Sequence, residues 1–237
     1  MDKTYEELAR SKVINKLKRD NSKPNFEHEI QKLKEKLLDS NLSHQSFNRI
    51  LKSIDILQSA SIAPRSLNIG DQAPDFELTN NHGRKFRLSE LVKKGKVLLN
   101  FYRGGWCPYC YLELRALQRI HSLVKKDGTQ IIGISPESVG DCQRTKERNQ
   151  LHFELLSDKA NIVSEKYRLI SKNNHSRDSI IDIGLESAID NGDISYQLPV
   201  PAIFIVDEWM TIRFAFQDPD SRKRVDTNLL LDCLTHI

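Results

Sequence analysis

The pattern of hydrophobic and polar positions changes near Pro64, which divides the chain into two parts. Residues 1–62 are polar and contain no glycine. Apolar side chains recur there at the three- to four-residue spacing of amphipathic helices, in two series: Phe26, Ile30, Leu33 and Leu37, then Phe47, Ile50, Leu51, Ile54 and Leu57. The pattern predicts a helical extension over 1–62 that packs on the rest of the chain or on a second subunit. A solvated linker helix is the alternative.

Beyond residue 62, short apolar runs alternate with helical periodicity, which predicts an α/β domain over 63–237. Buried strands are expected at 96–102 and 129–134, helices at 107–124, 138–150 and 159–169, a pair of strands at 202–206 and 211–216, and a last helix at 226–234. This order favours a sheet with helices on both faces. Residues 171–198 are rich in Ser, Asn, Asp and Gly without periodicity, which indicates a long loop or insertion.

Composition and charge narrow the class of protein. The 237 residues carry a net charge of +4 that is spread along the chain, so the field is weak and neither nucleic acid nor a membrane is expected as a partner. No stretch of the sequence approaches the ~20 apolar residues that span a bilayer. Acidic residues follow Met1 where a secretory signal has basic and apolar runs, so the expected location is the cytoplasm.

Cys107 and Cys110 form a Cys-x-x-Cys pair, a spacing typical of zinc binding or of redox chemistry. A zinc site needs a second pair, or two histidines at ligand spacing. Cys142 and Cys233 are isolated, and the histidines lack that spacing, so no metal is expected. The pair directly follows a predicted strand and opens a predicted helix. This placement argues against two unrelated core cysteines and favours a reversible dithiol.

The start of a helix is a favourable place for a thiolate. The first-turn N–H groups are unpaired and the helix dipole is positive there, so a cysteine can have a pKa well below the unperturbed ~8.5. Pro108 suits the first helical position because its missing N–H costs nothing. We therefore expect Cys107 at an exposed helix mouth, and Cys110 one turn further in, close enough to form a disulfide.

Several segments resemble known thiol proteins. Residues 106–110, Trp-Cys-Pro-Tyr-Cys, are similar to the thioredoxin-family active site, and glutaredoxins share the Cys-Pro-Tyr-Cys core. Residues 70–78, Gly-Asp-Gln-Ala-Pro-Asp-Phe-Glu-Leu, resemble the opening segment of the peroxiredoxin branch, the alkyl hydroperoxide reductase/thiol-specific antioxidant family. Residues 100–102 and the helix with Glu113 also match that branch. The resemblance implies a thioredoxin fold, a central mixed sheet flanked by helices.

The chain departs from the peroxiredoxin pattern around the cysteines. In the family's Pro-x-x-x-Thr/Ser-x-x-Cys motif the last cysteine attacks peroxide; Cys110 takes that place here, Cys107 replaces the Thr and Arg103 replaces the Pro. Pro201 stands where the family has an Arg before a late strand, and resembles the cis-proline that packs beside the thioredoxin disulfide. The thioredoxin alignment makes Cys107 the nucleophile and the peroxiredoxin alignment makes it Cys110. The helix-mouth argument favours Cys107.

Other side chains near the pair have both a functional and a structural interpretation. Arg103 would stabilise the thiolate and bind the developing peroxide oxyanion, or would be a solvated charge at a strand end. Trp106 would shield the substrate site, or would be a partly buried aromatic beside the turn. Glu113 would be a structural hydrogen-bonding residue, the favoured interpretation, or a proton carrier. Cys233 is expected as a small core residue, with a second resolving role as the alternative.

The sequence thus predicts a thiol peroxidase that reduces hydrogen peroxide or organic hydroperoxides through a Cys107/Cys110 dithiol–disulfide cycle. The resemblance implies thioredoxin or a similar dithiol as reductant; no metal or organic cofactor is expected. A thiol–disulfide oxidoreductase acting on protein disulfides is the first alternative, and a non-enzymatic redox sensor is the second. A homodimer is the assembly expected if the extension over 1–62 packs on a second subunit.

Overall fold

The computed structural model describes residues 66–170, 198–218 and 223–237. The helical extension predicted over 1–62, and all but the last residue of the loop predicted over 171–198, lie outside these residues. The described part forms a seven-stranded sheet in the order β2-β1-β5-β4-β3-β6-β7. Both cysteines of the pair lie in the first of these described ranges.

The described elements follow the predicted alternation. The strands are β1 (Glu77–Asn80), β2 (Lys85–Arg87), β3 (Val97–Phe101), β4 (Gln130–Ser135), β5 (Glu154–Ser157), β6 (Ala202–Val206) and β7 (Ile212–Gln217). The helices are α4 (Leu88–Leu91), α5 (Pro108–Lys126), α6 (Val139–Asn149), α7 (Ile162–Lys166) and α10 (Thr227–Leu234), with 3₁₀ turns η1 (Val92–Lys94) and η2 (Lys159–Asn161).

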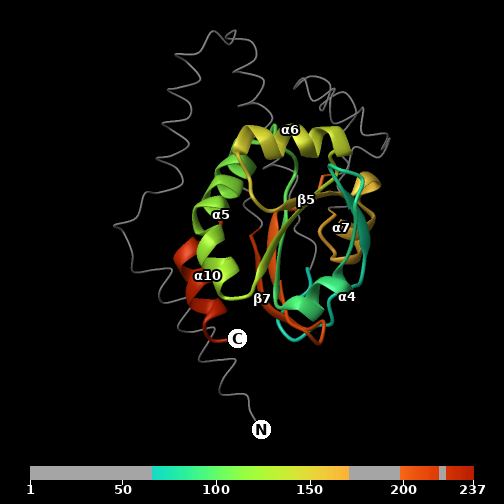
Figure 1. The fold of residues 1–237 in the computed structure, drawn as a ribbon. Coiled ribbons are helices and arrows are strands. Elements are labelled where there is room, and N and C mark those ends of the chain that lie inside the picture. Colours follow the sequence, from blue (N-terminus) through green and yellow to red (C-terminus); the bar gives the residue numbers. More distant parts are fainter. Residues whose placement is uncertain (1–65, 171–197, 219–222) are drawn as a thin grey trace.

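The sheet is mixed, and it is covered on both faces. β3, β4 and β5 are parallel, whereas β6 pairs antiparallel with β3 and β7 with β6. Side chains alternate along β3, so Leu98 joins the core under α5 and α10, and its neighbours Val97 and Leu99 join the core under α4 and α7. Figure 1 shows α5 and α10 on one side of the sheet with α4 and α7 on the other. The expected α/β architecture is therefore confirmed.

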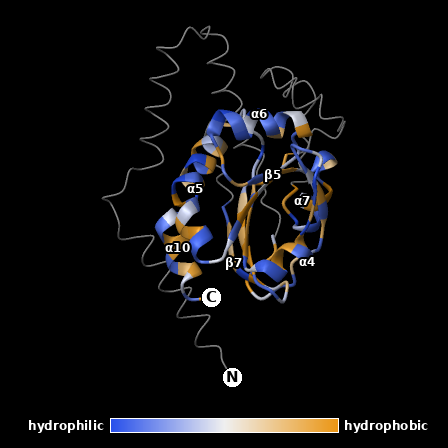
Figure 2. Ribbon diagram, in the orientation of Figure 1, coloured by the Kyte–Doolittle hydropathy of each residue, from blue (hydrophilic) through white to orange (hydrophobic). Residues whose placement is uncertain are grey.

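Helix α5 forms where its apolar residues recur on one face. Leu114, Leu117 and Val124 are buried against the sheet, and burying each contributes about 2 kcal/mol. The helix begins at Pro108, after an extended Cys107 at the N-cap, as the sequence predicts. Figure 2 shows hydrophobic strands in the middle of the domain and a hydrophilic outer surface on much of α6. The sheet and α5 thus fix where the cysteine pair emerges.

The helix predicted at 159–169 is wrong in extent, because left-handed backbone interrupts it. Ala160 and Asn161 have φ values of 66° and 57°, so η2 and α7 are separate short turns. The buried Asp158 carboxylate then accepts from the Val163 N–H at 2.9 Å and caps α7. The cap favours a new start at residue 162 over one continuous helix.

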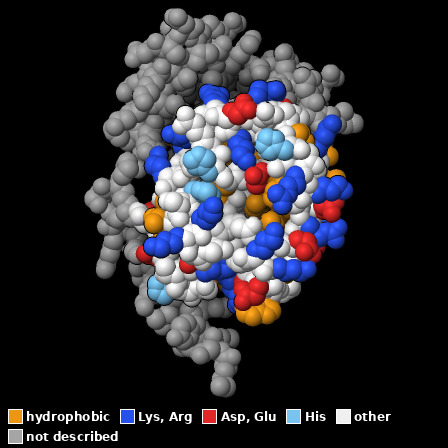
Figure 3. Space-filling model, viewed as in Figure 1, with side chains coloured by type: hydrophobic (Ala, Val, Ile, Leu, Met, Phe, Trp, Pro, Cys, Tyr) orange, Lys and Arg blue, Asp and Glu red, His pale blue; other side chains and the backbone are white. Residues whose placement is uncertain are grey.

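The surface carries dispersed charge. On the face in Figure 3, Lys and Arg side chains are spread among acidic and His side chains. The large hydrophobic side chains that are exposed in the described residues come from separate elements: Ile69, Leu123, Val139, Ile162, Trp209 and Ile237. Among the described helices, none combines the length and hydrophobicity needed to cross a membrane.

Candidate active site

The cysteine pair is presented by a tight turn between β3 and α5. The Cys107 N–H donates to the Gly104 carbonyl at 3.1 Å, and the Tyr111 N–H donates to the Cys107 carbonyl at 2.9 Å. Gly104 has φ of +150°, a conformation that favours glycine, and a Cβ there would lie 2.5 Å from Trp106 Nε1. The two consecutive glycines therefore let the chain reverse at once from the sheet into the helix.

Both cysteines are buried, so the expected exposed helix mouth is wrong. Cys107 is 3% exposed and Cys110 is fully buried, and both are free thiols. Trp106 and Tyr109, each partly buried, pack against the core cluster that contains them. Partial burial beside the turn fits both interpretations of Trp106, so its shielding role stays a prediction.

The two sulfurs differ strongly in acidity. Hydrogen bonding from the Cys110 thiol lowers the pKa of Cys107 to about 6; burial opposes the shift, and the charges of Arg103 and Arg224 assist it. Burial, and then the neighbouring Cys107, raise the pKa of Cys110 well above its ordinary value. A thiol that donates to its partner stabilises that partner's thiolate and keeps its own proton. The hydrogen bond within the pair therefore favours a thiolate on Cys107 and a thiol on Cys110.

Arg103 lies inside the protein, not in solvent. It is 7% exposed, so the alternative of a solvated charge at a strand end is wrong. Burial lowers the pKa of Arg103, while the charges of Cys107 and Cys110 raise it. A guanidinium placed this way compensates negative charge on either sulfur.

A second guanidinium reaches the pair from the far end of the chain. Arg224 Nη2 lies 3.8 Å from Cys110 Sγ, and its Nε lies 3.0 Å from Glu113 Oε2. The two side chains of this ion pair are 2% and 6% exposed. Burial raises the pKa of Glu113 to about 7, although Arg224 opposes the shift. Glu113 is therefore part of the charge system around Cys110 as well as a structural residue on α5.

Arg224 was not predicted from the sequence as a residue of the site. It follows other basic residues in a polar stretch, and the side chains of such a run usually lie in solvent. A weak signal was present in the apolar spacing of Val225, Leu229 and Leu230, which packs α10 against α5 and carries the preceding residue toward Cys110. That spacing predicts the docking of the helix but not the direction of the Arg224 side chain.

Comparison with known protein families shows which family the chain belongs to. A family profile described as the AhpC/TSA family matches residues 69–215, which contain Arg103, both cysteines and Glu113. The chain belongs to the AhpC/TSA family. The resemblance to the alkyl hydroperoxide reductase/thiol-specific antioxidant family that was inferred from the sequence is therefore confirmed. Arg224 lies beyond the matched range.

Individual relatives agree with this membership. A Coxiella burnetii protein that carries the name peroxiredoxin bcp is 37% identical over 109 residues, 46% of this chain and 72% of that protein. The thiol-disulfide oxidoreductase ResA of Geobacillus kaustophilus is 33% identical over 102 residues, 43% of this chain and 58% of ResA. The crystal structure of peroxidoxin BcpB from Mycobacterium tuberculosis matches with a TM-score of 0.57 at 21% identity, covering 72% of this chain and 98% of that one. The structural likeness confirms the thioredoxin fold.

In this AhpC/TSA chain the residue directly before β6 is the buried Pro201, at the position where the resemblance to peroxiredoxins implies an Arg. Ala202 pairs with Phe101, so Pro201 lies at the same end of the sheet as the turn that carries the cysteines. Arg103 and Arg224 bring positive charge to the cysteines from other positions.

The remaining cysteines are placed as core residues. Cys142 on α6 is fully buried, and burial raises the pKa of its thiol to about 12. Its sulfur lies 3.9 Å from the Glu137 carbonyl oxygen, to which it donates. Cys233 on α10 is partly buried against the same core cluster as Cys107 and Cys110. Such a high pKa makes Cys142 a poor nucleophile at neutral pH.

Proposed function

We propose that the chain is a thiol peroxidase in which Cys107 attacks the peroxide and Cys110 resolves the product. The observation that carries this proposal is the difference within the pair, where the pKa of Cys107 is lowered to about 6 and that of Cys110 is raised. At neutral pH Cys107 is then mostly thiolate and Cys110 mostly thiol. An attacking and a resolving sulfur need this distribution.

Each step of the cycle balances in atoms and electrons. The Cys107 thiolate attacks the terminal oxygen of the hydroperoxide, the O–O bond breaks, and the alkoxide or hydroxide leaves as alcohol or water after taking a proton from solvent, which replaces the one that Cys107 released on ionisation. Cys107 becomes a sulfenic acid. The Cys110 thiol then attacks the sulfenic sulfur, and the thiol proton leaves with the hydroxyl as water. The disulfide that results is reopened by two electrons from an external dithiol.

Two buried cations support these steps. Arg103 stabilises the thiolate before attack and the developing oxyanion during it, because a cation in a site that excludes water interacts strongly with new negative charge. Arg224 is beside Cys110, where it stabilises the resolving sulfur as it loses its proton. Trp106 and Pro201 are the proposed walls of the peroxide site.

The proposed cycle sets requirements on partners and location. Thioredoxin or a similar dithiol is the proposed reductant, and the cytoplasm is the proposed compartment because recycling needs a reducing environment. A protein reductant must reach one sulfur, so the oxidised chain must expose the pair more than the reduced chain does. A homodimer, the assembly considered from the sequence, is tested by light scattering of the full-length chain.

A stopped-flow experiment tests the peroxidase. The pre-reduced chain is mixed with hydrogen peroxide or cumene hydroperoxide, and Trp106 fluorescence is followed. We expect a fast second-order phase that Cys107→Ser abolishes. Cys110→Ser should keep the fast phase but stop at a sulfenic acid, which dimedone traps and mass spectrometry assigns to Cys107. A wild-type rate no faster than that of a free thiol contradicts the peroxidase, and a fast phase surviving in Cys107→Ser contradicts the assigned order.

The similarity to ResA favours one alternative, disulfide exchange with proteins. Burial of both sulfurs argues against it, because a small peroxide reaches a buried thiolate more easily than a protein disulfide does. Side-by-side assays of insulin reduction and of peroxide consumption decide between them. Sustained peroxide turnover with a dithiol reductant also contradicts a redox sensor that does not turn over.

A further inference from the structure

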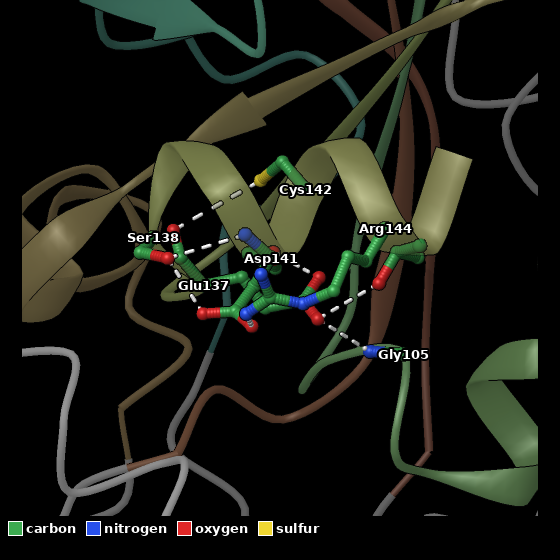
Figure 4. Close-up of polar contacts among 8 residues, drawn as sticks. Gly105, Glu137, Ser138, Asp141, Cys142 and Arg144 are labelled. Atoms are coloured by element: carbon green, nitrogen blue, oxygen red, sulfur yellow. Dashed lines mark hydrogen bonds and ion pairs between the residues drawn. The ribbon is translucent and has the colours of Figure 1, made fainter. Parts of the chain in front are cut away.

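Glu137 is a buried carboxylate that follows β4 and faces the catalytic turn. It is 5% exposed. Its Oε1 accepts from the Gly105 N–H and the Thr145 hydroxyl, both at 2.9 Å. Its Oε2 accepts from the Tyr102 hydroxyl at 2.9 Å and the Ser135 hydroxyl at 3.1 Å. Figure 4 shows the Gly105 amide directed at the Glu137 side chain beneath α6.

The donors to this carboxylate in the described residues are all uncharged. Taking a carboxylate out of water costs several kcal/mol unless it is well compensated. An ionised carboxylate only accepts, so each of its two oxygens can accept two of these four hydrogen bonds at once. A glutamine in its place has one accepting oxygen, and its NH₂ cannot accept. The arrangement of donors therefore favours a carboxylate at residue 137.

The bond to Gly105 fixes the turn that carries Cys107. Gly105 lies inside the turn closed by the Cys107 N–H and the Gly104 carbonyl at 3.1 Å. Its backbone packs so closely on α6 that a Cβ would lie 2.1 Å from Thr145 Oγ1. The turn is thus held by contact with Thr145 and by a charge-assisted hydrogen bond to Glu137. Bonds of that kind are shorter and stronger than those between two neutral groups.

We propose that Glu137 is a positioning residue for Cys107, holding the Gly104–Gly105 turn so that the Cys107 sulfur stays beside Cys110 and the two guanidiniums. The inference rests on the proposed function, because it adds a residue to that reaction. Glu137 touches no reacting atom. It acts through Gly105 on the place where the nucleophile is held.

Three possible roles for Glu137 give three different results at Cys107. Loss of a negative charge near the site lowers the Cys107 pKa, since the thiolate is less repelled. Loss of the hold on the turn raises that pKa, since the thiolate moves away from the Cys110 thiol, Arg103 and Arg224. A residue that only stabilises the fold leaves the pKa unchanged.

The test is a pH titration of thiolate ultraviolet absorbance in reduced full-length Glu137→Gln, with a Cys107→Ser chain as the blank. We expect the Cys107 pKa to rise by about one unit. At pH values below the pKa of the wild-type thiol, the variant then contains about tenfold less Cys107 thiolate. The matched control is Asp158→Asn. That carboxylate is also buried, and it accepts from the uncharged N–H groups of Val163 and Ser164 on α7 and not from the turn. The control should lose stability and keep the Cys107 pKa.

The outcomes separate the interpretations. A lower pKa in Glu137→Gln shows a charge effect and overturns the proposal; an unchanged pKa shows a purely structural role and overturns it too. If Glu137→Gln fails to fold, Thr145→Val removes one donor to the same oxygen and should raise the pKa by less, and no rise there overturns the proposal. The titration uses no peroxide. A raised pKa in a chain without fast peroxide reaction therefore keeps the positioning role and rejects the peroxidase.

Discussion

The Arg224 guanidinium lies 3.8 Å from the Cys110 sulfur, although 114 residues separate the two along the chain. The same guanidinium pairs with Glu113, one helical turn beyond Cys110 on α5. Because all three groups are buried, a charge that appears or disappears on Cys110 changes the energy of the ion pair beside it. Cys110 and the ion pair beside it therefore act as one electrostatic unit.

Replacing Arg224 should separate its structural from its catalytic contribution. Arg224→Met leaves Glu113 buried without its cation, and urea unfolding should show a loss of about 3 kcal/mol. Peroxide-driven disulfide formation should slow by roughly tenfold, since the pair loses a cation. The double variant Arg224→Met/Glu113→Gln should regain most of the stability and none of the rate. Recovery of both together would mean that Arg224 only supports the fold.

The rate of reaction with peroxide should follow ionisation of Cys107. Since the pKa of Cys107 is lowered to about 6, the second-order rate constant should rise with pH, reach half of its maximum near pH 6 and level off at higher pH. In Arg103→Met the half-rise should move to higher pH, because a cation that favours the thiolate is gone. Stopped-flow rates across the pH range check this. An identical profile in the two chains would contradict a role for Arg103 in thiolate stabilisation.

Glu113 should make the reduced protein less stable as pH rises. Its pKa is raised from 4.5 to about 7, so the folded state binds the proton more tightly than the unfolded state does. The stability from this group is fully present below pH 4.5 and is lost as pH rises through 7, a change of about 3 kcal/mol. The unfolding free energy of the wild type and of Glu113→Gln is measured from pH 4 to pH 8. The difference, wild type minus variant, should decrease as pH rises across that window. A flat difference would contradict the raised pKa.

The contact between Gly105 and Thr145 should appear as coupling between two mutations. Gly105→Ala places a Cβ 2.1 Å from Thr145 Oγ1 and should cost about 2 kcal/mol through overpacking. Thr145→Ala removes that oxygen, so the double variant should regain part of the loss. A double-mutant cycle in urea measures the coupling. Strict additivity of the two costs would show that the turn avoids Thr145 by moving elsewhere.

Cys142 should take no part in the redox cycle. Its thiol is fully buried with a pKa raised to about 12, so it remains protonated at neutral pH. Cys142→Ala should keep the peroxide rate and the Cys107–Cys110 disulfide, at a stability cost of about 1 kcal/mol. Mass mapping of the oxidised chain shows which sulfurs are joined. A mixed disulfide containing Cys142 would contradict the assignment.

The parts of the fold that sequence predicts are those with a strong local pattern. The largely apolar, fully buried run of β3 and the long periodicity of α5 could be assigned, and so could Cys107 at the helix start. Strands β1, β2 and β5 were not predicted, since each has only three or four residues and β1 and β2 are partly polar. The helix predicted at 159–169 failed because periodicity does not show the left-handed backbone at Ala160.

The site was predicted only where its residues adjoin the motif. Arg103 and Glu113 lie near the cysteines in sequence and were considered. Arg224 and Glu137 reach the site through tertiary packing, and their local sequence is that of ordinary solvated loops. The burial of Cys107 was missed for the same reason, because local sequence locates a helix start but not the side chains that cover it.

The order of the site residues along the chain has a consequence for biosynthesis. Arg103, both cysteines and Glu113 leave the ribosome close together, whereas Arg224 follows Cys110 by 114 residues. At translation speeds of roughly 5–20 residues per second, that interval is on the order of ten seconds. During it the nascent chain carries the cysteine pair without its second cation. The cysteine pair therefore acquires its second cation only after Arg224 has been synthesised and α10 docks on α5.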